Sequence, residues 1–256
     1  MEIIRSRQNP LAKLLLKLAD SRRERQKARQ SLLVGTHLVE AALDRDWPLA
    51  KLLLCEGMPE TPEISALLTR SPVGRVMLER ELFCAIEQTV TPTGMMAVCA
   101  LPDTPPPCTE GLVLLLEGVQ DPGNVGSMLR TAAAAGAAQV WLTPGCADLW
   151  SPKVLRAGMG AHFLLPAIER IDVEAALAGF AGPLAVTTLG NATPLFASPL
   201  RGSLVLALGS EGGGVSEKLL DRADLRLRIP MADGVESLNV AAAAAICLYE
   251  HVRQNR

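Results

Sequence analysis

The second half of the chain contains short, almost continuous apolar runs that alternate with stretches of helical character. The runs fall at 112–116, 140–142, 184–188, 204–208 and 225–229, and a helix is expected over 127–138. Strands of this kind are buried on both faces, so the pattern predicts an α/β fold with a mostly parallel sheet covered by helices. Ligands of such open sheets bind at the carboxyl ends of the strands.

A proline-rich segment precedes these runs. Residues 101–110 hold four prolines, which exclude a helix or a central strand and favour an extended linker. We therefore predict a first domain over 1–101, a linker over 102–110 and a second domain over 111–256. In the first, leucines 11, 14, 15 and 18 repeat at helical spacing, a further helix is expected at 37–43, and strands are expected at 51–54, 76–78 and 95–100. This is the pattern of a small α/β domain.

The charge is distributed unevenly. The whole chain of 256 residues has a formal net charge of -2, yet residues 1–30 contain nine Lys or Arg against three acids. The asymmetry indicates a polyanionic partner for the N-terminal end, and the alternative is a solvated helix face over 21–30. No apolar run has the length of a membrane span and no signal peptide is recognisable, so we expect a cytoplasmic protein without a membrane partner.

The six cysteines and three histidines show no metal-ligand spacing. Buried free thiols are expected, without a metal site or a disulfide framework. No Gly-x-Gly-x-x-Gly fingerprint or phosphate loop occurs in the sequence, which argues against a nucleotide-dependent dehydrogenase.

Polar side chains follow three of the predicted strands. Residues 121–130 carry Asn124 and Arg130, residues 209–216 carry Glu211 among glycines, and residues 229–239 carry Ser237 and Asn239. Arg130 is expected near the start of a helix. Helical side chains lean toward the helix N-terminus, and the free backbone N–H groups there favour binding of an anion.

Structural alternatives exist for each of these segments. Helix capping is the alternative for Asn124, Ser216 and Ser237, and a surface charge is the alternative for Arg130. The alanines over 241–245 predict close helix packing. Asn239 is expected near the start of a helix, where it has no evident structural role. We therefore expect its side chain to form a hydrogen bond to a ligand or to a catalytic neighbour.

In order and spacing, the three segments resemble the three motifs of the SpoU (TrmH-like) RNA ribose 2'-O-methyltransferases of the SPOUT superfamily. Residues 9–13 and 33–42 more weakly resemble the RNA substrate-binding domain often fused to that catalytic domain, which is similar in fold to a ribosomal RNA-binding protein. The resemblance implies a trefoil knot in the C-terminal domain, a homodimer whose active site spans both subunits, and S-adenosylmethionine as methyl donor. It implies an RNA substrate, with ribosomal RNA favoured over transfer RNA. A non-catalytic RNA-binding or assembly factor on the same fold is the alternative.

The resemblance also implies roles for ten residues. The expected catalytic residues are Asn124, Arg130, Glu211, Ser237 and Asn239, and the expected cofactor-binding residues are Leu189, Gly190, Gly209, Ile229 and Leu238. Members of the family are thought to use the counterpart of Arg130 as a base. Because an Arg side chain is effectively always protonated, we prefer Arg130 as a phosphate clamp that stabilises the developing alkoxide.

Overall fold

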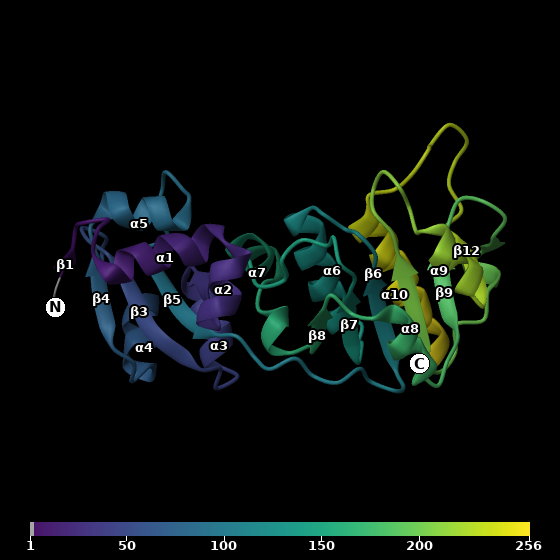
Figure 1. Cartoon of the computed structure of the whole chain (residues 1–256), viewed down its shortest axis with the longest axis horizontal. Helices are drawn as coiled ribbons and strands as arrows, with labels where there is room; N and C mark the ends of the chain where they lie inside the picture. Colours follow the sequence, from purple (N-terminus) through teal and green to yellow (C-terminus); the bar gives the residue numbers. More distant parts are fainter. Residues whose placement is uncertain (1–2) are drawn as a thin grey trace. The chain divides into compact units, whose positions relative to one another are not determined.

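The computed structural model describes residues 3–256, which form two compact units. The first unit contains the chain as far as Asp103 together with Trp150–Phe163, and the second contains Thr104–Leu149 and Leu164–Arg256. Figure 1 labels the elements of both units.

The first unit is a small α/β structure, as predicted, around a five-stranded sheet of order β1-β4-β3-β5-β2. Strands β1, β4 and β3 run parallel, and β5 is antiparallel to both β3 and β2. The sequence patterns did not predict β1, β2, α4 or α5, whereas α2 lies within residues 21–30, the helix of the alternative interpretation of the basic segment. The strands are β1 (Ile3–Ile4), β2 (Gln30–Val34), β3 (Leu49–Cys55), β4 (Arg75–Leu78) and β5 (Met95–Ala100), and the helices are α1 (Pro10–Asp20), α2 (Arg22–Ala28), α3 (Thr36–Leu43), α4 (Pro62–Arg70), α5 (Arg80–Glu87) and α7 (Pro152–Gly158), followed by the 3-10 turn η1 (Ala161–Phe163).

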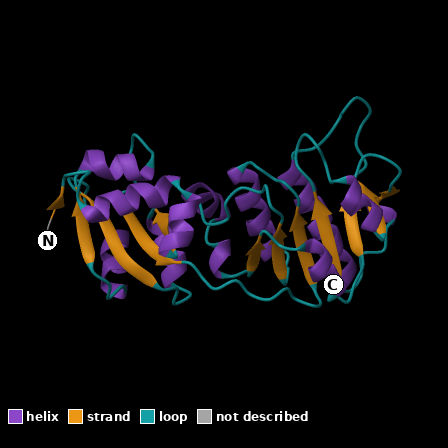
Figure 2. Ribbon diagram, viewed as in Figure 1, coloured by secondary structure: helices purple, strands orange, loops and turns teal. Residues whose placement is uncertain are grey.

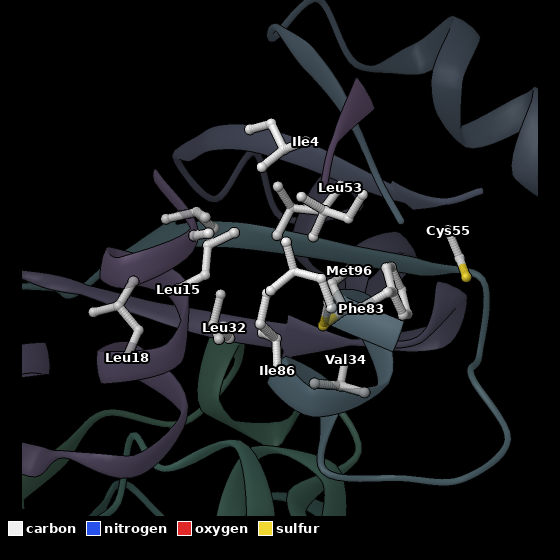
Figure 3. Close-up of a cluster of buried hydrophobic side chains, with 14 residues drawn as sticks. Ile4, Leu15, Leu18, Leu32, Val34, Leu53, Cys55, Phe83, Ile86 and Met96 are labelled. Atoms are coloured by element: carbon white, nitrogen blue, oxygen red, sulfur yellow. The ribbon is translucent and has the colours of Figure 1, made fainter. Parts of the chain in front are cut away.

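Helix α1 forms because its sequence combines a cap with an apolar stripe. The Asn9 side chain accepts a hydrogen bond from Leu11 N, and Pro10 occupies the first turn, where its missing N–H costs nothing. Leu15 and Leu18 are fully buried in the cluster of apolar side chains drawn in Figure 3. Burying a leucine of this kind contributes about 1.5–3 kcal/mol, so the leucine repeat anchors α1 to the sheet.

The segment Trp150–Phe163 packs in the first unit, although the predicted boundaries assigned it to the second domain. Ser31 Oγ donates a buried hydrogen bond of 2.6 Å to the carbonyl oxygen of Trp150. The indole of Trp47 stacks on Trp150, with ring centroids 5.8 Å apart, and lies 5.1 Å from the ring of Phe163. These buried aromatic contacts explain why the segment associates with a sheet that lies far from it in the sequence.

The second unit contains a seven-stranded sheet of order β10-β12-β9-β11-β6-β7-β8, in which every neighbouring pair is parallel. This confirms the predicted mostly parallel sheet. In Figure 2 the arrowheads of these strands point to one edge, from which long loops project. The strands are β6 (Leu112–Leu116), β7 (Gln139–Leu142), β8 (Ala167–Glu169), β9 (Leu184–Thr187), β10 (Thr193–Pro194), β11 (Leu204–Leu208) and β12 (Leu225–Arg228), and the helices are α6 (Pro122–Ala134), α8 (Val173–Ala178), α9 (Glu217–Arg222) and α10 (Val240–Asn255), with the 3-10 turn η2 (Leu195–Ala197).

Helices bury the sheet of the second unit on both faces. Alternate residues of β6 and β11 pack with Phe180 and with Leu219 of α9 in one apolar cluster. Helix α10 packs against α6 and β11, and Ala244 in its alanine run is fully buried. The predicted close packing of this alanine-rich helix is therefore confirmed, because a small side chain lets two helices approach closely.

Two further sequence predictions concern membranes and cysteines. None of the helices formed by residues 3–256 combines the length and the apolar character that crossing a bilayer demands. All six cysteines are free, and Cys55, Cys99 and Cys247 are buried. Burial raises the pKa of the Cys99 and Cys247 thiols to about 12, so both stay protonated and unreactive at neutral pH.

Candidate functional site

A pocket of about 450 Å³ lies in the second unit at the carboxyl ends of three neighbouring strands. Its wall is formed by residues that follow β9, β11 and β12 and by the segment that leads into α10. Pockets that bind small molecules have volumes of about 300–1,000 Å³ and occupy this edge of open α/β sheets. The pocket therefore has the size and position expected for a cofactor or a substrate.

The pocket brings together the five residues that the family resemblance assigned to a cofactor. Leu189, Gly190, Gly209, Ile229 and Leu238 all line it. Leu189 and Leu238 keep 61% and 38% of their surface exposed, whereas large apolar side chains elsewhere in the unit are mostly buried. An apolar part of a ligand placed between these side chains would remove that surface from water, so the wall fits a partly apolar cofactor.

The glycine-rich loop after β11 is a tight backbone turn. Ser210 and Gly214 exchange two main-chain hydrogen bonds of 3.1 and 2.9 Å. A Cβ atom on Gly209 would lie 1.9 Å from the carbonyl oxygen of Gly214, which no side chain tolerates. Gly209 is therefore required by the turn itself, and the turn lets main-chain atoms form the pocket wall.

Three of the predicted catalytic side chains form one hydrogen-bonded cluster. Asn124 Nδ2 donates to Glu211 Oε1 over 2.5 Å, and Asn239 Nδ2 donates to Asn124 Oδ1 over 3.0 Å. Glu211 lines the pocket, and Asn239 lies next to the pocket residues Leu238 and Val240. The cluster thus ties the start of α6, the glycine-rich loop and the start of α10 to one another.

The structure assigns two of the three helix caps differently from the sequence alternatives. Asp121, and not Asn124, caps α6, because Asp121 Oδ1 accepts the hydrogen bond of Asn124 N over 2.8 Å. Asn239, and not Ser237, caps α10, since Asn239 Oδ1 accepts from the N–H groups of Ala241 and Ala242. Asn239 thus has a structural role that the sequence analysis missed. Ser237 lines the pocket just before this cap.

Sequence reasoning also missed Glu117, the residue that follows β6. Its two carboxylate oxygens accept hydrogen bonds of 2.7 Å from the backbone N–H and the hydroxyl of Ser216. Ser216 in turn caps α9, which confirms the helix-capping role given for this residue as an alternative in the sequence analysis. A carboxylate directly after a buried strand was the available signal, because it places a charge at the functional edge of the sheet.

Arg130 also belongs to α6 but does not line the pocket. The helix begins at Pro122, so Arg130 is in its third turn and not near its start, as the sequence analysis expected. The side chain is exposed and is not among the residues that line the pocket. At 100° per residue, Arg130 points about 120° away from Asn124 around the helix axis. The geometry within one chain therefore does not bring Arg130 to the Asn124 cluster.

A parallel α/β unit with a small-molecule pocket at its strand ends, flanked by a polar cluster, is the arrangement of a cofactor-dependent enzyme domain. Comparison with known proteins makes the class specific. Residues 111–249 match the SpoU rRNA Methylase family, and residues 9–97 match the MRM3-like substrate binding domain. The chain belongs to the SpoU rRNA methylase family.

Individual relatives agree with this assignment over nearly the whole chain. The chain is 38% identical to the 23S rRNA (guanosine(2553)-2'-O)-methyltransferase RlmP of Bacillus subtilis, covering 99% of this chain and 100% of that protein. It is 32% identical to the 23S rRNA (guanosine-2'-O-)-methyltransferase RlmB of Pseudomonas putida, covering 88% and 96% of the two chains.

Among solved structures, the SpoU methyltransferase AviRb from Streptomyces viridochromogenes in complex with AdoMet is similar, with a TM-score of 0.89 at 27% identity. The match covers 97% of this chain and all of AviRb.

Proposed function

We propose that this protein transfers a methyl group from S-adenosylmethionine to the 2'-hydroxyl of a ribose in ribosomal RNA. The observation that carries the proposal is the hydrogen-bonded cluster of Asn124, Glu211 and Asn239 beside a pocket lined by all five expected cofactor residues. Two relatives named as 23S rRNA 2'-O-methyltransferases match 99% and 88% of the chain, and AviRb is a similar protein in complex with AdoMet.

The pocket would hold the methyl donor mainly through apolar contacts and main chain. Leu189, Ile229 and Leu238 supply the apolar wall, and Gly190 and Gly209 let the backbone come close. S-adenosylmethionine supplies an electrophilic methyl group when bound. The chain's own residues then position the acceptor ribose.

A ribose hydroxyl is a poor nucleophile until its proton is removed. In this proposal the oxygen would form its bond to the methyl carbon as the bond between that carbon and the donor's sulfur breaks, and the hydroxyl proton would pass to solvent water. Glu211 accepts the hydrogen bond of the Asn124 amide, which fixes that amide, and Asn124 in turn accepts from Asn239. In this proposal Asn124, Ser237 and Asn239 orient the ribose, and Glu211 holds the three motifs in register. Arg130 stays charged, grips the adjacent phosphate and stabilises the alkoxide as it develops.

We propose further that the protein acts as a homodimer whose active site spans both subunits. The position of Arg130 supports this, because the side chain is exposed yet lies outside the pocket of its own chain. The proposal includes three further features. The second and third motifs form a deep trefoil knot, and the N-terminal domain is similar in fold to a ribosomal RNA-binding protein. The protein is located in the cytoplasm.

Co-expression of two inactive subunits tests the shared site. If Arg130 acts in trans, an Arg130→Ala subunit paired with an Asn239→Ala subunit forms one intact site per mixed dimer. Half of randomly paired dimers are mixed, and each mixed dimer has one of its two sites intact. Methyl transfer should therefore recover to about a quarter of the wild-type rate. Activity that stays at the level of the two separate variants would place Arg130 in its own subunit's site or exclude the dimer. Arg130→Lys should keep part of the activity that Arg130→Ala loses, because it keeps the charge.

Titration calorimetry tests the cofactor independently of RNA. Pure, folded protein should bind S-adenosylmethionine, and Leu189→Asp should weaken that binding by placing a charge in the apolar wall. Absence of binding by the wild-type protein would favour the alternative of a non-catalytic RNA-binding or assembly factor.

A further inference from the structure

A second pocket lies in the catalytic unit, between η2, the loop that leads to β11 and the last turn of α10. It has a volume of about 410 Å³, and its lining includes Phe196, Arg201, Arg253 and Arg256. Three guanidinium groups therefore share one small depression with an aromatic ring. The proposed cofactor pocket uses none of these residues.

The loop that carries Arg201 is fixed to α10 by side-chain hydrogen bonds. Gln254 accepts from Leu200 N over 2.8 Å and donates to Ser198 O over 3.0 Å. Asn255 accepts from Gly202 N over 2.8 Å and donates to Leu200 O over 2.9 Å. The backbone on both sides of Arg201 is thus held against the helix, so the main chain that carries this cation is preorganised.

Arg253 is fixed as well. Its Nε and Nη2 atoms donate to the two carboxylate oxygens of Glu250, over 2.7 and 2.8 Å, while 68% of the side chain stays exposed. The side chains that line the pocket include three arginines and no Asp or Glu, which leaves a surplus of positive side-chain charge even with Arg253 paired to Glu250. Cations that line one pocket repel one another, and a bound anion would relieve that repulsion.

One exposed aromatic ring lines this pocket, and a second lies one turn before Arg253 on α10. All eight Trp, Tyr and Phe residues lie within residues 3–256, and among them only Phe196 and Tyr249 are exposed, at 58% and 49% of their surface. Tyr249 lies four residues before Arg253 on α10, hence on the same side of the helix. Rings that alternate with arginines are the recognition surface for single-stranded nucleic acid, because bases stack on the rings while arginines neutralise phosphates.

We propose that Phe196, Tyr249, Arg201, Arg253 and Arg256 form an accessory binding site for an unpaired segment of the substrate RNA, here called the arginine patch. The inference rests on the proposed function, since it assumes that RNA is the substrate. Self-association through the patch is less favourable, because a two-fold interface would bury the same arginine-rich surface of both copies together.

The arginine patch lies well away from the methyl-transfer site. Val240 lines the cofactor pocket, and Arg253 follows thirteen residues later on the same helix, about 20 Å away at 1.5 Å per residue. The patch therefore does not touch a ribose bound at the pocket of its own chain. It acts on the affinity for RNA, and its loss should raise KM and leave the chemical step at the distant site in place.

The test compares the full-length double variant Arg201→Ala/Arg253→Ala and the single variant Phe196→Ala with Arg222→Ala, an exposed arginine on α9. Methyl transfer is measured against total ribosomal RNA from cells that lack the gene, and binding is measured with a fluorescent twelve-nucleotide oligouridine over a salt series. We expect Phe196→Ala to raise the Kd about tenfold, as the loss of one stacked base does. The double variant should lower the slope of log Kd against log salt by about 0.7 per lost phosphate contact. Arg201→Lys should restore part of the affinity.

Patch variants whose KM, Kd and salt slope equal those of Arg222→Ala would overturn the arginine patch. A change of oligomeric state in sedimentation, without an effect on oligouridine binding, would overturn it too, by identifying the face as a contact between copies. Unfolding curves verify that each variant is folded. The proposed function is judged separately, because wild-type protein that transfers no methyl group contradicts it whatever the patch variants do.

Discussion

Asn239 Nδ2 donates a hydrogen bond to Asn124 Oδ1 over 3.0 Å, which joins two residues 115 positions apart in the chain. The same Asn239 side chain caps α10 through its oxygen, and the same Asn124 side chain donates to Glu211. Each amide therefore uses both of its ends. A change at either residue disturbs the start of a helix, the glycine-rich loop and the pocket edge together.

Asn124→Asp should disrupt this cluster. The new carboxylate would face Glu211 at the place where the amide now donates over 2.5 Å, so a hydrogen bond becomes a repulsion between like charges. We expect at least a hundredfold loss of methyl transfer, together with about 1–3 kcal/mol of lost stability. Gln120→Glu adds the same charge at an exposed position four residues earlier and serves as the matched control. Equal methyl-transfer activity of the two variants would show that Asn124 has no role in the active site.

Gly209→Ala should destabilise the loop after β11. The added Cβ would meet the Gly214 backbone at 1.9 Å, whereas a Cβ on Gly212 in the same loop meets nothing within 4 Å. The expected cost is about 1–3 kcal/mol or more for Gly209→Ala and under about 0.5 kcal/mol for Gly212→Ala. Denaturant unfolding of the two variants side by side measures the difference. An equal loss of unfolding free energy in the two variants would show that the turn rearranges to accommodate a Cβ atom on residue 209.

Glu250 should make stability depend on pH at the acid end. Hydrogen bonds from Arg253 and Gln254 lower the pKa of its carboxyl from 4.5 to about 2 in the folded protein. A lowered folded pKa stabilises the protein fully above the unfolded value, and this contribution is lost as pH falls from 4.5 through about 2. The stability difference between wild type and Glu250→Gln should therefore be largest at neutral pH and shrink over that window. A difference that stays constant with pH would contradict the pairing.

The packing of Trp150 in the first unit gives a prediction for the full-length chain. Trp150→Ala removes a ring stacked on Trp47 and should cost about 3–5 kcal/mol, as the loss of a buried tryptophan does. Amide exchange should rise in β2, where Ser31 bonds to the Trp150 carbonyl, more than in β6. Tyr249→Ala, which removes an exposed ring, is the control. Faster exchange in β6 with β2 unchanged would contradict this packing.

Much of the second unit could be predicted because its local signals agree with its tertiary structure. The strands at 112–116 and 204–208 are found at the predicted bounds, since a continuous apolar run flanked by glycine leaves no other element to form. The five expected cofactor residues meet in one pocket because parallel strands end at the same edge of the sheet.

The remaining features depend on partners that lie far away in the sequence. Nothing near Asn239 indicates that its amide reaches Asn124, and the capping role of Asp121 became evident only when the helix start was known at Pro122. The start of α6 was predicted too late because glycine and asparagine in its first turn are poor helix formers, and the prolyl residue at its start outweighs them. Likewise, the aromatic contacts that draw Trp150 to the first unit follow no local pattern.

Mapping 2'-O-methyl groups in ribosomal RNA tests the central claim most directly. RNA from cells that lack the gene is treated with pure protein and S-adenosylmethionine, and each nucleotide is assayed for a methylated ribose. We predict one ribose site that gains a methyl group with wild-type protein and stays unmodified with Asn124→Asp. Methyl transfer to a base, or no transfer by folded protein that binds S-adenosylmethionine, would contradict the proposed reaction.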